Sequence, residues 1–350
     1  MSQLKLMTTM TRPVTMAPLT LSSSSAEMSV LQLLTHQPSH LVRSIWLFTY
    51  SDLKTIIATS VGFGMFTSAG ASAFGVDPTT NWLDYPKALL PVLLWTWLNL
   101  LPFSIDNQRQ PASILEDSLN KPWRPMPANR MTPTQARQLM LALDVAAVGT
   151  SMLLRGGLAP CLTLLGLGYW YNEARGSDDG FIVRNLINGL GFVSYLCGAA
   201  QLALGSARWA QFIADGSPGP LWIGIIGAVV TTTVQTQDMY DQVGDQARGR
   251  RTLPLILGDG PARWVTAIAM GIWGPACVWF WGGTPTTTSI VGAVLGVGLA
   301  WAIALRCVTV RSPSDDKTTF RLWNLWLVSL YALPLLVGAD AGGKEMTDSR

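Results

Sequence analysis

The stretch DMYDQVGDQARGRRTLPLILGD, residues 238–259, follows three residues after the apolar run PLWIGIIGAVVTTTV. It carries four aspartates and three arginines in a chain of which only 13% of the residues are charged. Asp238, Asp241 and Asp245 recur at i, i+3 and i+7, a spacing that places three carboxylates on one face of a helix. Because like charges on one face repel each other, the pattern predicts a neutralising partner at the end of a membrane-like helix.

A divalent cation is the partner that these carboxylates favour. Mg²⁺ takes hard oxygen ligands, keeps water in its shell and commonly bridges protein carboxylates to substrate phosphates. The alternative is an ordinary solvated helix end. Arg248, Arg250 and Arg251 follow at once, and guanidinium groups suit a phosphate. The stretch therefore predicts Mg²⁺ together with a phosphorylated ligand.

The composition indicates a membrane protein. Of the 350 residues, 49% are hydrophobic, and the mean hydropathy is +0.30. Charged residues make up 13% of the chain, about half of the roughly 25% found in soluble domains. Apolar stretches recur that are long enough to cross a hydrocarbon core of about 30 Å. The net charge of +3 is too small to indicate a nucleic-acid partner. We therefore expect an all-α, multi-pass membrane protein.

Cysteine and histidine chemistry is not indicated. The four cysteines lie far apart in apolar runs, and both histidines lie in the N-terminal segment. This spacing predicts neither a zinc site nor a disulfide framework. Acid–base catalysis by histidine is not expected.

The apolar runs predict nine membrane spans. They cover residues 53–75, 87–105, 138–154, 157–171, 185–205, 219–237, 264–282, 287–306 and 322–338. Residues 1–40 are rich in Ser, Thr, Met and Pro, which predicts a disordered tail. The membrane domain is expected over residues 41–340, followed by a polar C-terminal tail at residues 341–350.

Basic residues are distributed unequally between the loops. Fifteen Lys and Arg residues fall in or beside the loops after the second, fourth, sixth and eighth spans, and three in those after the odd-numbered spans. The positive-inside rule then places the N-terminus and the loops near residues 110 and 248 in the cytosol. A different span count would scramble this parity, so the asymmetry also favours nine spans.

A second cluster of acids and bases lies on the same expected side, in DNQRQPASILEDSLNKPWRP, residues 106–125. Its oxygen donors for a metal are Asn107, Glu116 and Asp117, and its bases for phosphate oxygens are Lys121 and Arg124. Alone, the stretch is also compatible with an ordinary charged loop. It stands four spans before the first cluster, in a corresponding position, which favours two loops facing one ligand.

These two stretches resemble the motifs of the UbiA superfamily of intramembrane prenyltransferases. DMYDQVGDQARGRRTLP is similar to the second aspartate-rich motif of that family, D-x-x-D-x-x-x-D followed by G-R-R-T-L-P. EDSLNKPWRP is similar to the end of its first motif, N-D-x-x-D-x-x-x-D before N-K-P-x-R-P. The resemblance covers about residues 45–340. It implies a nine-helix bundle around a central cavity, in which both motifs hold an isoprenoid diphosphate through Mg²⁺.

The resemblance also implies roles for individual residues. The expected metal ligands are Asp238, Asp241, Asp245 and Asp117, which match the family's motifs, together with the nearby donors Asn107 and Glu116. The expected catalytic residues among them are Asp238, Asp241, Asp117 and Asn107. The implied diphosphate-binding residues are Lys121, Arg124, Arg250, Arg251, Arg184 and Tyr171.

The first motif departs from the family pattern. Counted back from Asp117, the positions of the family's Asn, Asp and Asp fall on Arg109, Gln110 and Ser113, and Gln237 replaces the lysine usual before the second motif. If the loop has a different backbone conformation from that of the family, nearby oxygen donors can take the place of the missing motif residues. These donors are Asp106, Asn107 and Glu116.

These departures bear on the expected reaction. A drifted first motif is found in fungal members of the superfamily that are terpene cyclases, which favours cyclisation of a C15 or C20 prenyl diphosphate. The alternative is transfer of the prenyl group to an aromatic or other small acceptor. An ion-coupled transporter is the non-enzyme alternative, disfavoured because the acids lie at helix ends on one side. The fungal resemblance makes the endoplasmic reticulum the expected membrane; no protein partner is predicted.

Overall fold

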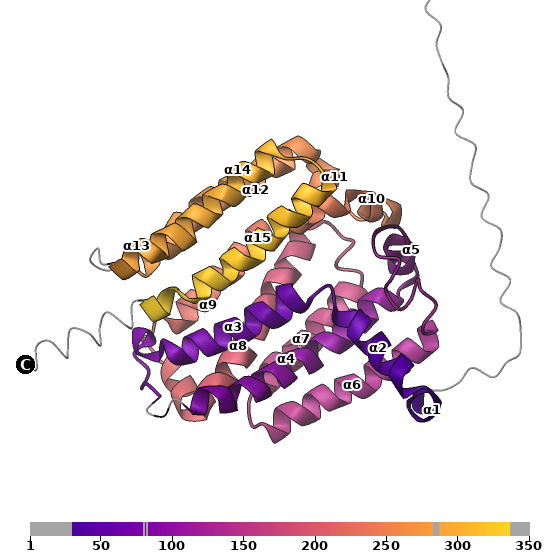
Figure 1. Ribbon diagram of the computed structural model, residues 1–350, viewed down its shortest axis with the longest axis horizontal. Coiled ribbons are helices and arrows are strands. Elements are labelled where there is room, and N and C mark those ends of the chain that lie inside the picture. Colours follow the sequence, from indigo (N-terminus) through magenta and orange to yellow (C-terminus); the bar gives the residue numbers. More distant parts are fainter. Residues whose placement is uncertain (1–29, 80, 82, 283–286, 337–350) are drawn as a thin grey trace, which may run out of the picture.

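The computed structural model describes residues 30–79, 81, 83–282 and 287–336 (Figure 1). Most of the expected N-terminal tail and all of the expected C-terminal tail lie outside these residues. The described chain begins in a helix at Val30. Most of residues 30–40, the last part of the expected tail, therefore belong to helices.

Within the described ranges the protein contains helices and no strands. The elements are α1 (Val30–His36), α2 (Pro38–Thr49), the π-helix η1 (Leu53–Ile57), α3 (Ala58–Ala69), the 3₁₀ turn η2 (Ala71–Phe74), α4 (Asp84–Arg109), α5 (Pro111–Asn120), α6 (Pro133–Leu153), α7 (Leu158–Asn172), α8 (Phe181–Phe212), α9 (Gly219–Thr233), the 3₁₀ turn η3 (Val234–Gln237), α10 (Asp238–Arg248), α11 (Leu253–Leu257), α12 (Asp259–Phe280), α13 (Thr287–Ala293), the π-helix η4 (Val294–Gly298), α14 (Leu299–Thr309) and α15 (Pro313–Tyr331).

Four helical segments are long and apolar enough to cross a membrane, among the residues that the structure describes. They are Asp84–Arg109, Phe181–Phe212, Gly219–Arg248 and Ile290–Thr309. Each of the nine expected ranges overlaps helical residues, but several of these helices are short or interrupted. The all-helical architecture is therefore confirmed, whereas the count of nine crossings stays a prediction.

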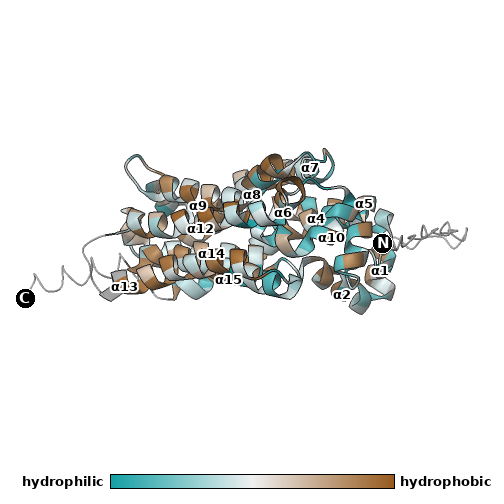
Figure 2. Cartoon of the chain, turned by 90° about the horizontal axis from the view of Figure 1, so that it is seen from above, coloured by the Kyte–Doolittle hydropathy of each residue, from teal (hydrophilic) through white to brown (hydrophobic). Residues whose placement is uncertain are grey.

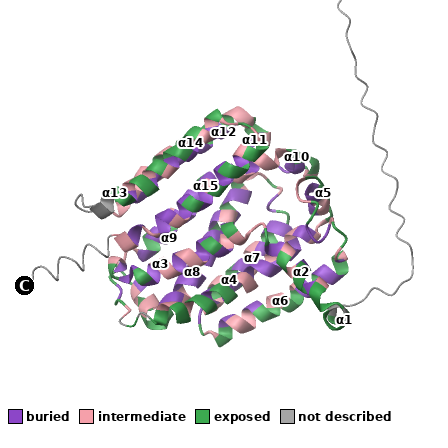
Figure 3. Ribbon diagram, viewed as in Figure 1, coloured by how far each residue is buried: buried purple, intermediate pink, exposed green. Residues whose placement is uncertain are grey.

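Helix α8 lies at the centre of the bundle. It packs against α3, α4, α7 and α9, and α12 packs against α14 (Figure 1). The outer surface is rich in large apolar side chains, such as Leu153 and Trp279, whose exposed fractions are 84% and 83%. Figure 3 shows exposed residues along outer helices such as α6 and α14. In water such a surface would drive aggregation, but in lipid it has no such cost. The exposed surface therefore suits a bilayer.

Hydrophilic residues gather at the end of the bundle that carries α5 and α10 (Figure 2). These two helices, which hold the two sequence clusters, pack against each other. A Cβ atom at Gly244 of α10 would stand 2.1 Å from Nδ2 of Asn120 at the end of α5. A larger residue at position 244 would therefore displace the Asn120 side chain, which donates to Asp241.

Candidate active site

A cavity of about 140 Å³ lies beneath the junction of α5 and α10. Ten of the twelve site residues expected from the sequence line it: Asn107, Glu116, Lys121, Arg124, Tyr171, Arg184, Asp238, Asp241, Asp245 and Arg250. Asp117 and Arg251 do not line it. The fold thus brings α4, α5, α7, α8 and α10 together around one charged space.

Two α10 carboxylates are held by arginines. Arg184 of α8 forms a two-pronged ion pair with Asp238, with Nη1 to Oδ2 at 2.9 Å and Nη2 to Oδ1 at 2.8 Å. Arg250 donates from Nη1 to Oδ1 of Asp245 at 3.1 Å. Both carboxylates are almost fully buried, and Oδ2 of Asp245 has no hydrogen-bond partner. The arginines therefore neutralise charges that burial alone would penalise.

Asp241, the third carboxylate on this face, has no arginine partner. Asn120 donates from Nδ2 to its Oδ1 at 3.2 Å, and Lys121 Nζ lies 3.5 Å from its Oδ2. Both partners come from the end of α5, so Asp241 is the link between the two clusters. It is also the α10 carboxylate held least tightly.

Glu116 is the acid that α5 turns toward the cavity. It accepts from Nη1 of Arg250 at 3.1 Å and from Nη1 of Arg248 at 3.3 Å. Burial by itself would raise the pKa of Glu116, but Arg250, Lys121 and Arg248 outweigh it and hold the pKa below its usual value. Glu116 is thus a stable anion at neutral pH.

Asp117, the neighbouring acid, points elsewhere. Both of its oxygens accept from Nη1 of Arg124 at 3.0 Å, and the side chain does not line the cavity. Burial raises the pKa of Asp117 in spite of Arg124 and Lys121. The geometry therefore gives Asp117 the task of holding Arg124 and gives Glu116 the place facing the ligand.

The remaining expected residues separate into those inside and outside the cavity. Asn107 lines it and donates from Nδ2 to Oδ1 of Asn172 at 2.9 Å, a bond that leaves the amide oxygen of Asn107 unused. The side chain of Arg251 is exposed. Asp106 is paired with Arg109 at 2.6 Å and lines a different pocket, so it is not the substitute for the missing first-motif acids.

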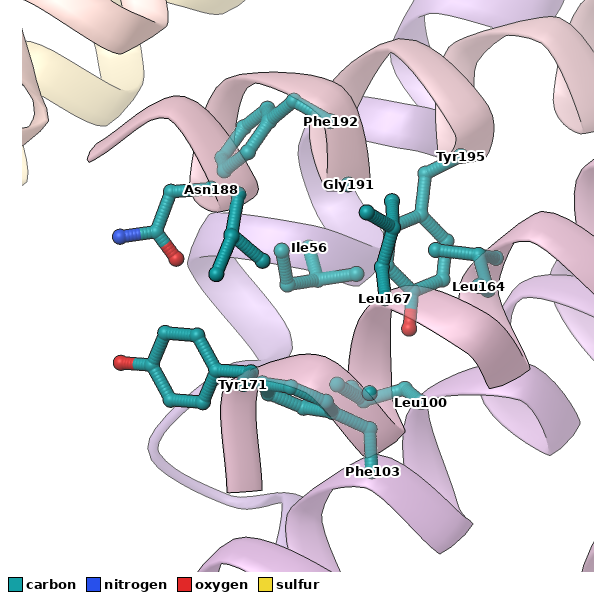
Figure 4. A pocket seen from close by; sticks show the side chains of 12 residues that line it. Ile56, Leu100, Phe103, Leu164, Leu167, Tyr171, Asn188, Gly191, Phe192 and Tyr195 are labelled. Carbon is teal, nitrogen blue, oxygen red and sulfur yellow. The ribbon is translucent and has the colours of Figure 1, made fainter. Parts of the chain in front are cut away.

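An apolar chamber of about 70 Å³ adjoins the charged cavity. The residues that line both spaces are Ile56, Leu100, Phe103, Tyr171, Asn188 and Phe192. In Figure 4 the polar ends of Tyr171 and Asn188 point to the same side, and the aliphatic and aromatic side chains surround the space beyond them. The site as a whole suits a ligand with a charged head and a hydrocarbon tail.

Two contributors were missed by the sequence interpretation. Asn188 lines both spaces, and its buried Nδ2 has no hydrogen-bond partner. Asp178 accepts from Nε of Arg248 at 3.1 Å and so supports the basic residues of the second cluster. The spacing of Arg184 and Asn188 at i and i+4 on one helix face was a usable signal for the first; Asp178 had no such signal.

The donor set fits a magnesium ion shared with a ligand. Among the described residues, no three acidic, histidine or cysteine side chains converge closely enough to enclose a metal alone. Mg²⁺ is usually bound through one or two carboxylates, water and substrate phosphates. Asp241 and the unpartnered Oδ2 of Asp245 supply such carboxylate oxygens. A phosphorylated ligand would provide the remaining oxygens and give the arginines new partners.

Comparisons with known proteins agree with this geometry. Residues 110–326 match the UbiA prenyltransferase family. The fumagillin beta-trans-bergamotene synthase of Aspergillus fumigatus is 28% identical over 307 residues, which cover 85% of this chain and 93% of that protein. The somaliensene A/B synthase of Streptomyces somaliensis is 30% identical over 298 residues, which cover 82% of this chain and 92% of that protein.

The fold is shared with solved structures. A UbiA homologue from Archaeoglobus fulgidus, solved with GPP and Mg²⁺ bound, superposes with a TM-score of 0.55 at 13% identity and covers 80% of this chain and 98% of its own. The family match spans more than half of the chain, and the relatives are named as enzymes. The transporter alternative is accordingly set aside, and the chain belongs to the UbiA prenyltransferase family of integral membrane enzymes.

Proposed function

We propose that this protein uses Mg²⁺ to ionise a C15 or C20 prenyl diphosphate and cyclises the resulting cation to a terpene. The observation that carries the proposal is the junction of the two spaces. A cavity lined by five carboxylates and four arginine or lysine side chains opens onto an apolar chamber. A prenyl diphosphate has this division between a charged head and a hydrocarbon tail.

The charged residues would bind and orient the diphosphate. Arg184, Arg250 and Lys121 lie around the α10 carboxylates and would exchange those partners for phosphate oxygens. Asp241, Asp245 and Glu116 would hold Mg²⁺, with Asn107 beside them. When bound, Mg²⁺ supplies charge that stabilises the departing diphosphate.

The apolar chamber would determine the fate of the cation. When the C1–O bond breaks, its electron pair leaves with the diphosphate and an allylic carbocation remains. Phe103, Phe192 and Tyr195 offer aromatic rings that stabilise positive charge. The apolar lining excludes water, so an internal double bond of the chain can attack the cation before a water molecule does. Loss of a proton then gives a neutral cyclic hydrocarbon.

Cyclisation is favoured over transfer by the relatives. Two that align over most of this chain are named as synthases of bergamotene and somaliensene. Transfer to an acceptor remains the alternative, since a polyprenyl transferase of Hericium erinaceus is 27% identical over 221 residues. The departures in the first motif support the former.

Purified protein supplied only with farnesyl or geranylgeranyl diphosphate tests the proposal. With Mg²⁺ it is expected to release a cyclic hydrocarbon, detected by gas chromatography and mass spectrometry, and to lose this activity in EDTA until Mg²⁺ is restored. Linear alcohols alone, together with prenylation of an added aromatic acceptor, would assign the transferase function instead. The variant Asp84→Asn, at an exposed acid far from the cavity, is the matched control.

We also propose that α5 and α10 face the cytosol in the endoplasmic reticulum membrane. The asymmetry of basic residues supports this orientation. In a chain without its four cysteines, Ser118→Cys and Gln246→Cys are expected to react with an impermeant thiol reagent from the cytosolic side, and Asp215→Cys from the other side. All three positions are exposed. Labelling of positions 118 and 246 from opposite sides contradicts the proposed site.

A further inference from the structure

One face of α8 runs the length of the site. Arg184, Asn188, Gly191 and Tyr195 follow each other at i, i+4, i+7 and i+11, which aligns them along one side of the helix. Arg184 lines the charged cavity, Asn188 lines both spaces, and Gly191 and Tyr195 line the apolar chamber. Gly191 stands about 10 Å along the helix axis from Arg184. It therefore lies beside the hydrocarbon tail of a ligand whose head is at Arg184.

The absence of a side chain at Gly191 is not required by packing. A Cβ atom built there meets no heavy atom within 4 Å. Two other glycines of α8 differ: a Cβ atom at Gly198 would stand 2.0 Å from the ring of Trp95, and one at Gly189 would stand 2.0 Å from the hydroxyl of Thr231. Those two glycines permit contact between helices, whereas Gly191 leaves open space.

Backbone geometry gives no reason for glycine at this position either. Gly191 is inside a regular part of α8, and its φ is not positive, in contrast to Gly205 at the kink. Glycine in a helix interior is unfavourable relative to alanine or leucine. The feature that glycine provides here is room in the chamber, which Figure 4 shows between Gly191 and the side chains of Ile56 and Leu167.

We propose that Gly191 determines the length of the prenyl chain that the site accepts, by leaving the apolar chamber open about two helical turns from the diphosphate-binding end. This inference rests on the proposed function for the identity of the ligand. A branched side chain at position 191 would occupy part of a chamber of about 70 Å³. It would exclude the distal isoprene units and leave the charged cavity unchanged.

Binding of non-ionising ligands tests this directly. The probes are the S-thiolodiphosphate analogues of geranyl, farnesyl and geranylgeranyl diphosphate, with inorganic pyrophosphate as a probe of the head alone, all with Mg²⁺ and the full chain. In Gly191→Leu the affinity for the longest analogue that the unaltered protein binds is expected to fall at least about tenfold relative to the geranyl analogue. The affinity for pyrophosphate is expected to stay within about twofold, because Arg184 and Arg250 are untouched.

Two further variants complete the test. Gly149→Leu on α6 is the matched control, because a Cβ atom there also meets nothing within 4 Å and the residue lines neither chamber. Gly191→Ala is expected to give a smaller shift of the same sign and guards against a folding defect in the larger variant. Equal loss for all chain lengths, loss of pyrophosphate binding, or an equal shift in Gly149→Leu overturns the inference.

The experiments distinguish a failure of the role of Gly191 from a failure of the proposed reaction. If the unaltered protein binds the analogues and Gly191→Leu changes their length dependence, but no prenyl diphosphate is turned over, the proposed reaction fails and the role of Gly191 stands. If turnover is found and Gly191→Leu keeps the binding profile and product chain length of the unaltered protein, the role of Gly191 fails and the proposed reaction stands.

Discussion

Helix α10 aims three carboxylates into the cavity, whereas α5, which packs against it, aims one. On α10 each acid has a different partner: Arg184 for Asp238, Arg250 for Asp245, and the end of α5 for Asp241. On α5, Glu116 faces the cavity. The two sides of the site are therefore unequal, with three carboxylates from α10 and one from α5, while Lys121 and Arg124 follow α5. Substitutions on the two sides should differ in what they damage.

Asp238→Ala is expected to have the largest effect, because it removes both a carboxylate that lines the cavity and the counter-ion of buried Arg184. An aspartate at an ordinary solvated helix end could be replaced with little effect on stability, but Asp238 is 1% exposed and pairs with buried Arg184. Breaking such a pair costs about 3–5 kcal/mol. A thermal unfolding midpoint equal to that of the unaltered protein would show that the pair contributes nothing to stability.

The double variant Asp238→Asn with Arg184→Gln separates the two effects. It removes both charges and should recover much of the stability lost in the single variant, while turnover stays absent. Recovered turnover would mean that the ion pair is structural only.

Asp241→Asn is expected to separate activity from stability. Asp241 lacks an arginine partner and is half-buried, so its neutralisation leaves no buried guanidinium unpaired. Loss of one charge-stabilising group in an active site lowers kcat by about 100- to 1000-fold. Steady-state release of pyrophosphate measures this, with Asp84→Asn beside it. Activity within about threefold of the unaltered protein would remove Asp241 from the metal site.

The pair Glu116→Gln and Asp117→Asn tests the inequality within α5. Glu116→Gln removes a carboxylate that accepts hydrogen bonds from two arginines, each worth about 1.5–3 kcal/mol, so kcat/KM should fall roughly tenfold to a hundredfold. Asp117→Asn should reduce kcat/KM less and instead lower the unfolding temperature, because Arg124 loses its partner. A larger loss of kcat/KM in Asp117→Asn than in Glu116→Gln would contradict this assignment. It would show that Asp117, which matches the family motif, is the functional acid of α5.

Arg251→Gln is expected to have the smallest effect. Its side chain is exposed, and exposed substitutions usually change free energies by less than about 0.5 kcal/mol, which is roughly twofold in kcat/KM. Arg250→Gln is the matched comparison, since it leaves Glu116 and Asp245 without their shared partner. Equal losses in both variants would show that Arg251 also reaches the diphosphate.

The sequence was sufficient for features that depend on local spacing. Apolar runs predicted an all-helical membrane architecture, and the i, i+3, i+7 pattern predicted that Asp238, Asp241 and Asp245 share a face, as they do in the structure. Features that depend on packing could not be predicted. Glu116 and Asp117 are adjacent, and the rotation of α5 about its own axis decides which of them meets the cavity.

Ion pairs between residues of distant helices likewise could not be predicted from local sequence patterns. Arg184 was expected to bind diphosphate, but its pairing with Asp238 depends on how α8 and α10 pack. The open space at Gly191 also depends on three other elements around it, η1, α4 and α7. The number of membrane crossings stays a prediction, because η1, η2 and η4 divide expected spans into shorter pieces.

The ion pairs around α10 have a consequence for the order in which the chain assembles. Arg184 is 54 residues from Asp238, Asn120 is 121 residues from Asp241, and Glu116 is 134 residues from Arg250. Contacts between such distant residues form late, after the intervening loops have closed. During insertion the acids of α10 therefore enter the membrane surface before their counter-ions have docked, and the site becomes electrically balanced only when the bundle is complete. Two separately expressed halves divided between α7 and α8 should accordingly be inactive alone and gain activity only by associating.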